Sequence, residues 1–265
     1  MTVRAKKSLG QNFLIDKNII RKIVATAGDI SDCTVIEIGI GTGNLTNALL
    51  STDVKSVIGV EKDSRFIENV KHDKFSVIEA DALEVDLSQL ADGKKKVVAN
   101  LPYNISTTLL INWMEYAEAF ESFTLMFQKE VADRIVADTR TKSYGRLSVL
   151  VQSLCSAKRE FDIPPQAFRP QPKIMSSVVT ITPNNSRTKR EEFFKPLKII
   201  TKAAFGQRRK MLRSSLKALD CEHLTCTHLE LLKQVGIPET ARAEEISVEK
   251  FCELAKAYNK CIKTS

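Results

Sequence analysis

Short apolar runs alternate with segments of helical periodicity in the first half of this 265-residue chain, and no other feature constrains its fold as strongly. This alternation is typical of a parallel sheet whose strands are joined by crossover helices. The expected strands are residues 34–39, 56–62, 75–80, 96–100 and 123–128. The expected helices are residues 16–27, 44–51, 63–71, 105–119 and 129–138. Two later apolar runs, residues 148–154 and 176–183, could supply further strands, parallel or antiparallel.

The last part of the chain has a different pattern. Residues 184–193 are polar and charged, follow a proline, and are predicted to form a linker. Beyond them, apolar residues recur at helical spacing without strand signals, which predicts a small all-α domain. We therefore expect an α/β chain of two domains, with residues 1–187 forming the sheet domain and residues 188–265 the helical domain.

The charge balance favours a polyanionic partner. The chain holds 40 Lys and Arg against 32 Asp and Glu, which gives a net charge of +8 and a pI near 9.1. Nucleic acid is the first partner to expect and an anionic membrane the second. No run reaches the roughly 18 apolar residues that a membrane span needs, and the basic opening residues lack the apolar segment of a secretory signal. We expect a cytoplasmic protein that does not enter a membrane.

The cysteines predict neither a disulfide framework nor a metal site. Six cysteines show no framework spacing, which favours reduced thiols in a cytoplasm. Cys221, His223, Cys226 and His228 offer zinc-ligating atoms, but they lie too close together for a zinc finger, whose ligand pairs are separated by a longer loop. We expect a loop and a helix start with buried thiols here, and no metal.

A glycine-rich turn, EIGIGTGNLT, closes the first strand of the alternation and opens a helix. Gly39, Gly41 and Gly43 allow the backbone to turn sharply and to pass close to a ligand. The dinucleotide fingerprint G-x-G-x-x-G fails, because its sixth position is Asn44 when counted from Gly39 and Thr46 when counted from Gly41. The remaining G-x-G-x-G pattern, with an acidic residue before it, suits a nucleoside ligand without a pyrophosphate.

Acidic residues end the next two strands. Glu61 lies 22 residues after Gly39, where an acid can accept hydrogen bonds from a ribose diol. Asp81 follows the third strand and could accept a hydrogen bond from an adenine amino group, or it could simply cap the following turn. Three successive strand ends with a nucleoside contact are stronger evidence than any one of them.

The fourth strand ends in NLPYNIS, which predicts a grip on an amino group. The side-chain oxygen of Asn100 and a backbone carbonyl near Pro102 are acceptors that could hold an –NH2 group and direct its lone pair toward an electrophile. Tyr103 could stack on the base that carries this amine, as aromatic residues do with splayed nucleobases. The alternative is that Asn-Leu-Pro-Tyr forms only a turn.

At these residues the chain resembles the ribosomal RNA adenine N6-dimethyltransferases, a family that uses S-adenosyl-L-methionine. The resemblance rests on eight stretches that occur in order: QNFL (11–14), EIGIGTGNLT (37–46), VEKD (60–63), EADAL (79–83), NLPYNIS (100–106), YGRLSV (144–149), FRPQPKIMSSVV (168–179) and AFGQRRKMLRSSL (204–216). It implies a class I, Rossmann-like methyltransferase sheet in residues 1–187 and a small all-α C-terminal domain in residues 188–265 that contributes to RNA binding. One departure is Ile40, where many relatives have proline; it affects the stiffness of the loop more than the chemistry.

The resemblance also assigns residues to the site. The expected cofactor-binding residues are Gln11, Asn12, Leu14, Gly39, Gly41, Gly43, Glu61, Lys62, Asp81, Ala82 and Asn100. The expected catalytic residues are Asn100, Leu101, Pro102, Tyr103 and Phe168, with Tyr103 and Phe168 as the aromatic pair that sandwiches a flipped adenine. The expected RNA-binding residues are Arg4, Lys6, Lys7, Arg208, Arg209, Lys210 and Arg213, the last four on a single helix.

The implied function is the dimethylation of N6 of two adjacent adenosines near the 3′ end of small-subunit (16S) rRNA, during ribosome biogenesis. The implied partner is the immature small ribosomal subunit, and the chain is expected to act as a monomer. Two alternatives stay open at this point. One is a large-subunit rRNA adenine methyltransferase of the macrolide-resistance type. The other is a non-catalytic assembly or transcription factor on the same fold.

Overall fold

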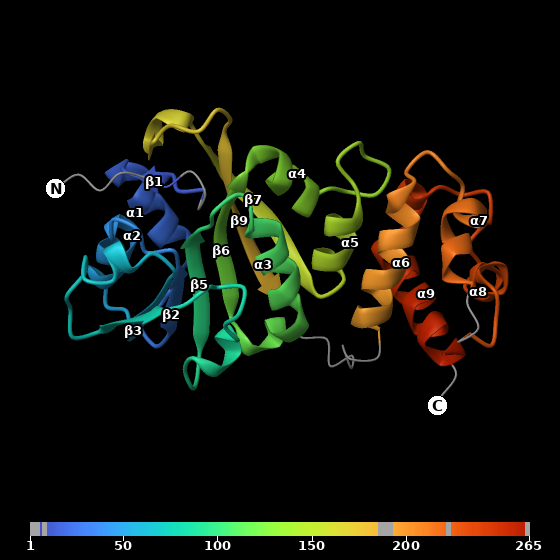
Figure 1. Ribbon diagram of the computed structural model, residues 1–265, viewed down its shortest axis with the longest axis horizontal. Coiled ribbons are helices and arrows are strands. Elements are labelled where there is room, and N and C mark those ends of the chain that lie inside the picture. The colour runs from blue at the N-terminus through green and yellow to red at the C-terminus, as the bar shows by residue number, and fades with distance from the viewer. Residues whose placement is uncertain (1–5, 7–9, 185–192, 221–223, 263–265) are drawn as a thin grey trace. The chain divides into compact units, whose positions relative to one another are not determined.

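The computed structural model describes residues 6, 10–184, 193–220 and 224–262. The chain forms two compact units (Figure 1). The first comprises Met1–Ala132 and Ser156–Asn184, and the second comprises Asp133–Cys155 and Asn185–Ser265. Residues 133–155, which the sequence analysis placed in the first domain, therefore pack with the helical unit.

The first unit is built on a mixed sheet that, within the described residues, has seven strands in the order β4-β3-β2-β5-β6-β9-β7 (Figure 1). These strands are β2 (Thr34–Ile38), β3 (Ser56–Glu61), β4 (Phe75–Glu79), β5 (Lys95–Asn100), β6 (Ser122–Gln128), β7 (Cys155–Ile163) and β9 (Ser176–Pro183). The first five of them pair in parallel, whereas β9 runs antiparallel to β6. The carboxyl ends of β2, β3, β4, β5 and β6 therefore lie along one edge of the sheet.

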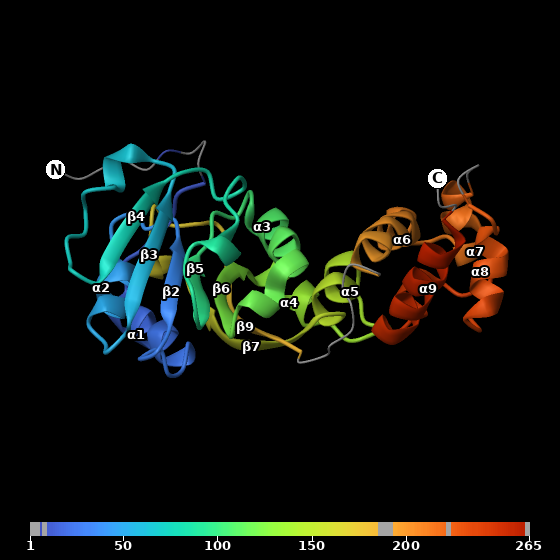
Figure 2. The same cartoon turned by 90° about the horizontal axis from the view of Figure 1, so that it is seen from below.

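Helices cover both faces of this sheet (Figure 2). They are α1 (Lys17–Thr26), α2 (Asn44–Leu50), α3 (Ser106–Trp113) and α4 (Lys129–Ile135). Ile23 of α1 and Leu49 of α2 are fully buried against one face. Trp113, at the end of α3, stacks on Phe123 of β6 on the opposite face, with ring centroids 6.1 Å apart. Because β2 is buried on both sides, its sequence is an apolar run rather than an alternating one.

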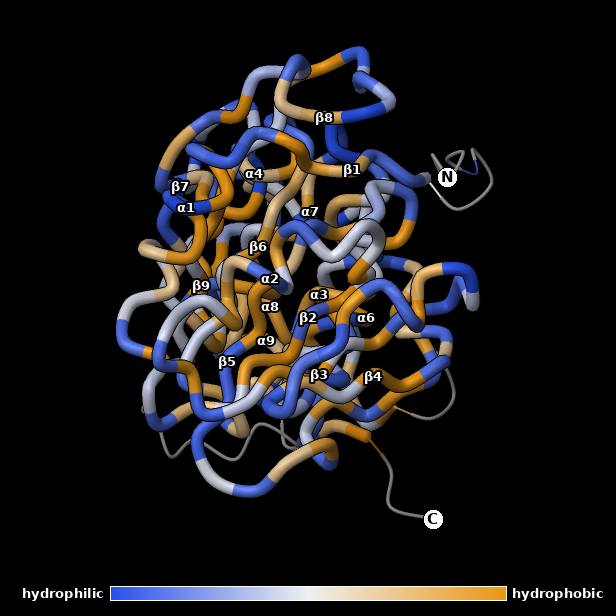
Figure 3. The backbone as a smooth tube through the Cα atoms, turned by 90° about the vertical axis from the view of Figure 1, so that its left-hand side faces the viewer, coloured by the Kyte–Doolittle hydropathy of each residue, from blue (hydrophilic) through white to orange (hydrophobic). Residues whose placement is uncertain are grey.

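Short elements complete the first unit. They are β1 (Phe13–Leu14) and β8 (Phe168–Arg169), which pair antiparallel, and the 3-10 turns η2 (Ser64–Phe66), η3 (Leu87–Gln89), η4 (Met114–Ala119) and η5 (Pro165–Ala167). Hydrophobic stretches of the backbone lie mainly inward, and the outer loops are mainly hydrophilic (Figure 3). Among the described residues, every helix is too short or too polar to cross a membrane.

The second unit is helical. It contains α5 (Arg146–Gln152), α6 (Phe194–Gly206), α7 (Leu212–Ser215), α8 (His228–Gln234) and α9 (Val248–Cys261), with the 3-10 turns η7 (Leu216–Leu219) and η8 (Ala243–Glu245). Phe205 of α6 packs between Tyr144 and Phe251, with ring centroids 6.0 and 5.5 Å apart. The hydroxyl of Tyr144 donates to the carbonyl of Ile246 at 2.9 Å. These contacts join α5, α6 and α9 into one small core.

The structure corrects three expectations about secondary structure. Residues 148–154 were expected to form a strand, but they lie mostly in α5; Leu147–Val151 are all buried, and a short, fully buried run has the same pattern in a helix and a strand. Residues 63–71 were expected to form a helix and contain only the turn η2. Strand β7 was not predicted, because its charged residues obscure the apolar alternation.

The cysteines also differ from expectation. Cys226 and Cys261 form a disulfide, whereas all thiols were expected to be reduced; Cys33, Cys155 and Cys252 are free. A pairing between residues 35 positions apart leaves no spacing motif to recognise. No group of residues in the described ranges is arranged to hold a metal ion, and Cys221 and His223 lie outside those ranges.

Candidate active site

A cavity of about 260 Å³ opens at the carboxyl ends of β2, β3 and β5. This volume is close to the lower end of the range for small-molecule sites, about 300 Å³. All the residues that the sequence analysis assigned to a cofactor line it except Gly43: Gln11, Asn12, Leu14, Gly39, Gly41, Glu61, Lys62, Asp81, Ala82 and Asn100. Leu101, Pro102 and Tyr103 line the same cavity. Residues that lie far apart in the sequence therefore meet at this cavity, because the parallel strands end beside one another.

The glycine-rich turn forms one wall of this cavity. Gly39 and Gly41 have φ angles of 75° and 49°, which non-glycine residues rarely adopt. A Cβ at Gly41 would also lie only 2.9 Å from the ring of Phe13, so this position has no space for a side chain. Its backbone carbonyl accepts a hydrogen bond from Nδ2 of Asn69 at 2.8 Å. The glycine φ angles and the hydrogen bond from Asn69 together fix the shape of this turn beside the cavity.

The N-terminal segment, defined here as residues 10–15, crosses the cavity. Within it, β1 pairs with β8, so that Leu14 lies opposite Phe168. Nδ2 of Asn44 donates to the carbonyl of Leu14 at 2.8 Å, and Nδ2 of Asn100 donates to the carbonyl of Asn12 at 2.8 Å. These bonds tie the segment to the start of α2 and to the end of β5.

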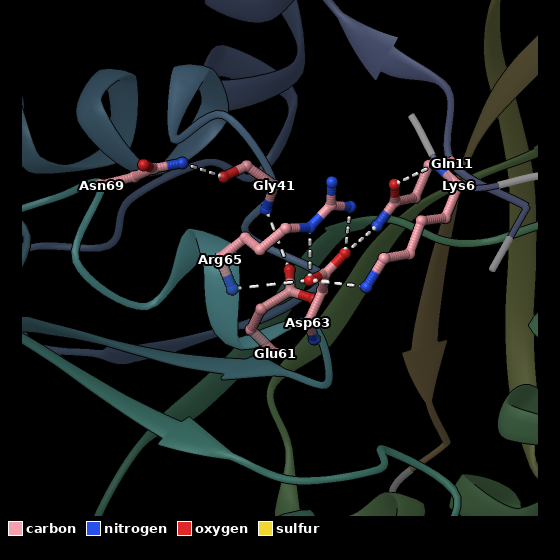
Figure 4. Close-up of polar contacts among 7 residues, drawn as sticks. All are labelled: Lys6, Gln11, Gly41, Glu61, Asp63, Arg65 and Asn69. Carbon is pink, nitrogen blue, oxygen red and sulfur yellow. Dashed lines mark hydrogen bonds and ion pairs between the residues drawn. The ribbon is translucent and has the colours of Figure 1, made fainter. Parts of the chain in front are cut away.

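A buried carboxylate, Asp63, anchors the beginning of this segment (Figure 4). Its side chain is 1% exposed and is bound by Arg65 through Nε at 2.9 Å and Nη2 at 2.5 Å. Gln11 donates to it at 3.0 Å and the ammonium of Lys6 at 3.2 Å. Arg65 first, then Gln11 and Lys6, hold the pKa of Asp63 well below its usual range, against the opposing effect of burial. Lys6, which was expected to contact RNA, is thus an ion-pair partner of Asp63.

Asp63, Arg65 and Asn69 were missed in the sequence. The available signal was the acid of VEKD that follows Glu61 after a single lysine. Arg4 and Lys7, the other expected RNA contacts at this end, lie outside the described residues.

Glu61 links the glycine-rich turn to the loop that carries Asp63. Its carboxylate is nearly buried and accepts from the N–H of Gly41 at 3.0 Å and from the N–H of Asp63 at 2.8 Å, one at each oxygen (Figure 4). A carboxylate oxygen can accept a second hydrogen bond, so both remain able to accept from a ligand hydroxyl. The two backbone bonds fix where those acceptors lie.

Asp81 caps the following turn, which is one of the two roles considered for it in the sequence, and it also pairs with Lys62. One carboxylate oxygen accepts from Lys62 at 2.6 Å, and the other accepts from the N–H of Leu83 at 3.0 Å, which caps the turn. The bond from Lys62, followed by that from Leu83, lowers the pKa of Asp81. The carboxylate stays charged and faces the cavity as an acceptor.

Glu37, at the end of β2, has the opposite electrostatic environment. Its side chain is buried, and no described residue donates to its Oε2. Burial raises the pKa of this carboxyl to about 8, and the negative charge of Glu61 acts in the same direction. Near neutral pH Glu37 is therefore mainly protonated and can donate as well as accept. A buried polar group without a partner beside a cavity indicates room for a polar ligand.

Asn100 and Tyr103 occupy the far side of the cavity. No described residue donates to Oδ1 of Asn100, whose amide nitrogen is used on Asn12. The carbonyl of Pro102 accepts from the N–H groups of Ile105 and Ser106 at 3.1 and 3.0 Å, and so begins α3. The hydroxyl of Tyr103 lies 2.5 Å from Oγ of Ser176. The alternative prediction that Asn-Leu-Pro-Tyr forms a turn is confirmed. The turn still leaves Oδ1 of Asn100 available as an acceptor.

The structure does not bring Phe168 to the cavity. Its side chain is 1% exposed and packs in the core beneath β1, where Leu14 lies opposite it. The expected sandwich of Tyr103 and Phe168 is therefore not formed in this structure. The antiparallel pairing of β1 with β8 is a contact between distant segments that no local pattern announces.

Arg208, Arg209, Lys210 and Arg213 were expected to lie on a single helix, but they do not. Helix α6 ends at Gly206 and α7 begins at Leu212, so Arg208, Arg209 and Lys210 lie in the intervening turn, and only Arg213 is helical. All four are exposed. Nε of Arg208 pairs with Glu244 at 2.8 Å.

The comparisons of this chain with known proteins agree with one another. The family model described as "Ribosomal RNA adenine dimethylase" matches residues 2–260. The chain is 48% identical over 262 residues to Ribosomal RNA small subunit methyltransferase A of Rhodospirillum rubrum, which covers 96% of this chain and 88% of that protein. The protein of the same name from Wolbachia sp. subsp. Brugia malayi is 46% identical over 262 residues, covering 96% and 97%.

Two solved structures share the fold. A dimethyladenosine transferase from Plasmodium falciparum superposes with a TM-score of 0.78 at 26% identity, over 94% of this chain and 98% of that one. The 23S rRNA methyltransferase ErmE superposes with a TM-score of 0.66 at 23% identity, over 93% and 99%. The expected Rossmann-like methyltransferase sheet with a helical C-terminal region is confirmed.

Proposed function

Because the chain belongs to the ribosomal RNA adenine dimethylase family, we propose that it dimethylates N6 of two adjacent adenosines near the 3′ end of small-subunit (16S) rRNA. The proposed methyl donor is S-adenosyl-L-methionine, and the proposed partner is the immature small ribosomal subunit in the cytoplasm, on which the chain acts as a monomer. The observation that carries this proposal is the convergence of Glu61, Asp81 and Asn100 on one cavity.

Small-subunit rRNA methylation is preferred over large-subunit rRNA methylation and over a non-catalytic role, each for its own reason. The relatives that are 46–48% identical over nearly the whole chain are named as small-subunit enzymes, whereas the large-subunit enzyme shares 23% identity and supports the fold alone. A non-catalytic role would not require Asn100 to keep an available acceptor beside the cavity.

The cavity fits the donor by its chemistry. Glu61 offers acceptors for a ribose diol, and Asp81 offers one for an adenine amino group. A Cβ placed on Gly39 would have no atom within 4 Å, so the backbone there leaves room for a ligand to approach closely. When bound, S-adenosyl-L-methionine supplies an electrophilic methyl group on a sulfonium. The chain itself supplies position and hydrogen bonds.

Asn100 is assigned to the target amine. An adenine amino group is a poor nucleophile because its lone pair is delocalised into the ring. Acceptance of its N–H bonds by Oδ1 of Asn100 and by the carbonyl of Leu101 would favour a more tetrahedral nitrogen. Leu101 is preferred to Pro102 because the Pro102 carbonyl already accepts two N–H groups. Alignment of this kind can remove roughly 7–11 kcal/mol of a barrier in ideal cases.

The proton is released to water after transfer, so no side-chain base is required. None of the described residues that line the cavity is a histidine. After the first methylation the amine keeps one N–H, so one of the two acceptors must be dispensable in the second round. Tyr103 is assigned to stack on the base, without Phe168, which is buried.

The test uses immature ribosomal subunits. The chain is incubated with labelled S-adenosyl-L-methionine and either small or large subunits, and the labelled nucleotides are mapped by primer extension. Label is expected on two adjacent adenosines near the 3′ end of the small-subunit RNA. Label confined to the large subunit would refute the small-subunit proposal, and label on neither would favour the non-catalytic alternative.

A further inference from the structure

Tyr103 and Ser176 form a contact that base stacking alone does not require. Their hydroxyl oxygens lie 2.5 Å apart, although the residues are separated by 73 positions. Tyr103 follows β5, Ser176 begins β9, and β6 lies between these strands in the sheet. The ring of Tyr103 therefore has a second attachment, at the end opposite its backbone.

Ser176 is itself held firmly. It is fully buried and lies opposite Gln128 in the antiparallel pairing of β9 with β6. The preceding carbonyl, that of Met175, accepts from the N–H of Lys129 at 2.9 Å. The backbone of Ser176 is thus held by the sheet, and its buried hydroxyl lies where Tyr103 can bond to it.

The adjacent serine has a different partner. Successive residues of a strand point to opposite faces of the sheet. Ser177 is also fully buried, and its hydroxyl donates to Asp162 of the neighbouring strand β7 at 2.7 Å. The chain therefore contains a matched control for a serine hydroxyl that does not contact Tyr103.

We propose that Ser176 is a positioning residue for methyl transfer, which fixes the direction of the long axis of the Tyr103 ring and thereby the alignment of the stacked adenine with Asn100. The proposal rests on the proposed function. A tyrosine side chain has only two rotatable bonds, and a hydrogen bond at the phenol oxygen holds the end of the ring's long axis in place, which restricts rotation about the first of them, the Cα–Cβ bond. Misplacement of a reacting group by about 1 Å can cost on the order of 100-fold in rate, so a small tilt of the ring has a large effect.

The test is a double-mutant cycle on kcat, measured with saturating S-adenosyl-L-methionine and the subunits that the wild type labels. Ser176→Ala and Tyr103→Phe should each lower kcat about tenfold, because each removes the same bond and retains the aromatic face. The double variant should be no slower than either single variant. Ser177→Ala should keep wild-type kcat, and Ser176→Thr, which keeps the hydroxyl, should recover most of the activity lost in Ser176→Ala.

Three results would overturn the proposal. One is a Ser176→Ala enzyme with wild-type kcat; another is a Ser176→Ala effect that persists undiminished in the Tyr103→Phe background. The third is an equal loss in Ser177→Ala, which would indicate damage to β9. Urea unfolding of each variant separates loss of fold from loss of alignment. Activity on large subunits alone would refute the proposed substrate while the same cycle still tests Ser176, and a wild type that is inactive on both subunits would overturn both proposals.

Discussion

Two buried carboxyl groups of this site, those of Asp63 and Glu37, differ in charge because their hydrogen-bonding partners differ. Asp63 is buried but bound by three cationic or amide donors, which keep it ionised. Glu37 is buried without such donors to its Oε2, and its pKa rises to about 8. Environments that separate the pKa values of neighbouring acids assign them different tasks. Here Asp63 acts as a fixed anion, whereas Glu37 is a neutral hydrogen-bonding group near pH 7.

Replacement of Glu37 with Gln should change how stability depends on pH. The pKa of Glu37 is about 8 in the folded chain against an ordinary value of 4.5, so protonation favours folding. This contribution is fully present below pH 4.5 and is lost as pH rises through about 8. Each unit of pKa difference corresponds to about 1.4 kcal/mol. Because glutamine cannot ionise, Glu37→Gln should match the wild type at low pH and be more stable at pH 9.

The measurement is urea unfolding of the ligand-free wild type and Glu37→Gln between pH 5 and pH 9. The difference in the free energy of unfolding should grow in favour of the variant across this range. Parallel pH profiles would show that Glu37 does not carry a proton in the folded chain.

Asn100→Ala should nearly abolish methyl transfer. Loss of one preorganised hydrogen-bonding group at a reacting centre commonly lowers kcat about 10²–10³-fold. RNA binding should stay within a few-fold of the wild type, because phosphate contacts dominate such affinity. Asn112→Ala, an exposed asparagine on α3, is the control and should transfer at the wild-type rate. Normal methylation by Asn100→Ala, measured in single turnovers with pre-bound subunits, would refute the assigned mechanism.

At the scale of elements, most of the cavity residues that lie at the ends of the parallel strands could be predicted from the sequence. The cavity residues Glu61, Asp81 and Asn100 could be predicted because the carboxyl ends of parallel strands meet at one edge. The burial of Phe168 and the bond from Gln11 to Asp63 could not, because both depend on an N-terminal segment that contacts distant residues. Local patterns specify strands and turns, whereas such pairings are decided by tertiary packing.

Asp63→Asn should weaken binding of S-adenosyl-L-methionine through the N-terminal segment. Asparagine keeps the size of the side chain but loses the charge that holds Arg65, Lys6 and Gln11. Hydrogen bonds to charged groups contribute about 1.5–3 kcal/mol each, so a tenfold to hundredfold rise in Kd is expected. The rate at saturating cofactor should change much less, which is the pattern of a binding contact.

The measurement is equilibrium dialysis with labelled S-adenosyl-L-methionine. The control is Asp32→Asn, which removes an ion pair with Lys94 in which both side chains are 57% exposed. Exposed pairs contribute little, so its Kd should stay within about twofold of the wild type. Equal Kd values for Asp63→Asn and Asp32→Asn would show that the Asp63 contacts do not hold the segment over the cofactor.

At the scale of the whole molecule, the candidate active site and the basic turn lie in different units of the chain. The cavity and all its described lining residues belong to the sheet unit, whereas the basic turn between α6 and α7 belongs to the helical unit. The chain enters the helical unit twice, because residues 133–155 leave the sheet and return to it. The sequence did not show this, since a buried helix, α5, looked like one more strand.

The basic turn should make RNA binding salt-dependent in proportion to its available charges. Each phosphate contact contributes roughly 0.7–0.9 to the slope of log K against log salt concentration. Arg209→Ala and Lys210→Ala should each lower that slope by about this amount and should weaken binding to all RNA sequences similarly. Arg208→Ala should have a smaller effect, because its guanidinium already pairs with Glu244 and a phosphate would have to compete for it. Filter binding of small subunits from 50 to 300 mM salt tests the order, and a larger change of slope for Arg208→Ala than for Arg209→Ala would contradict it.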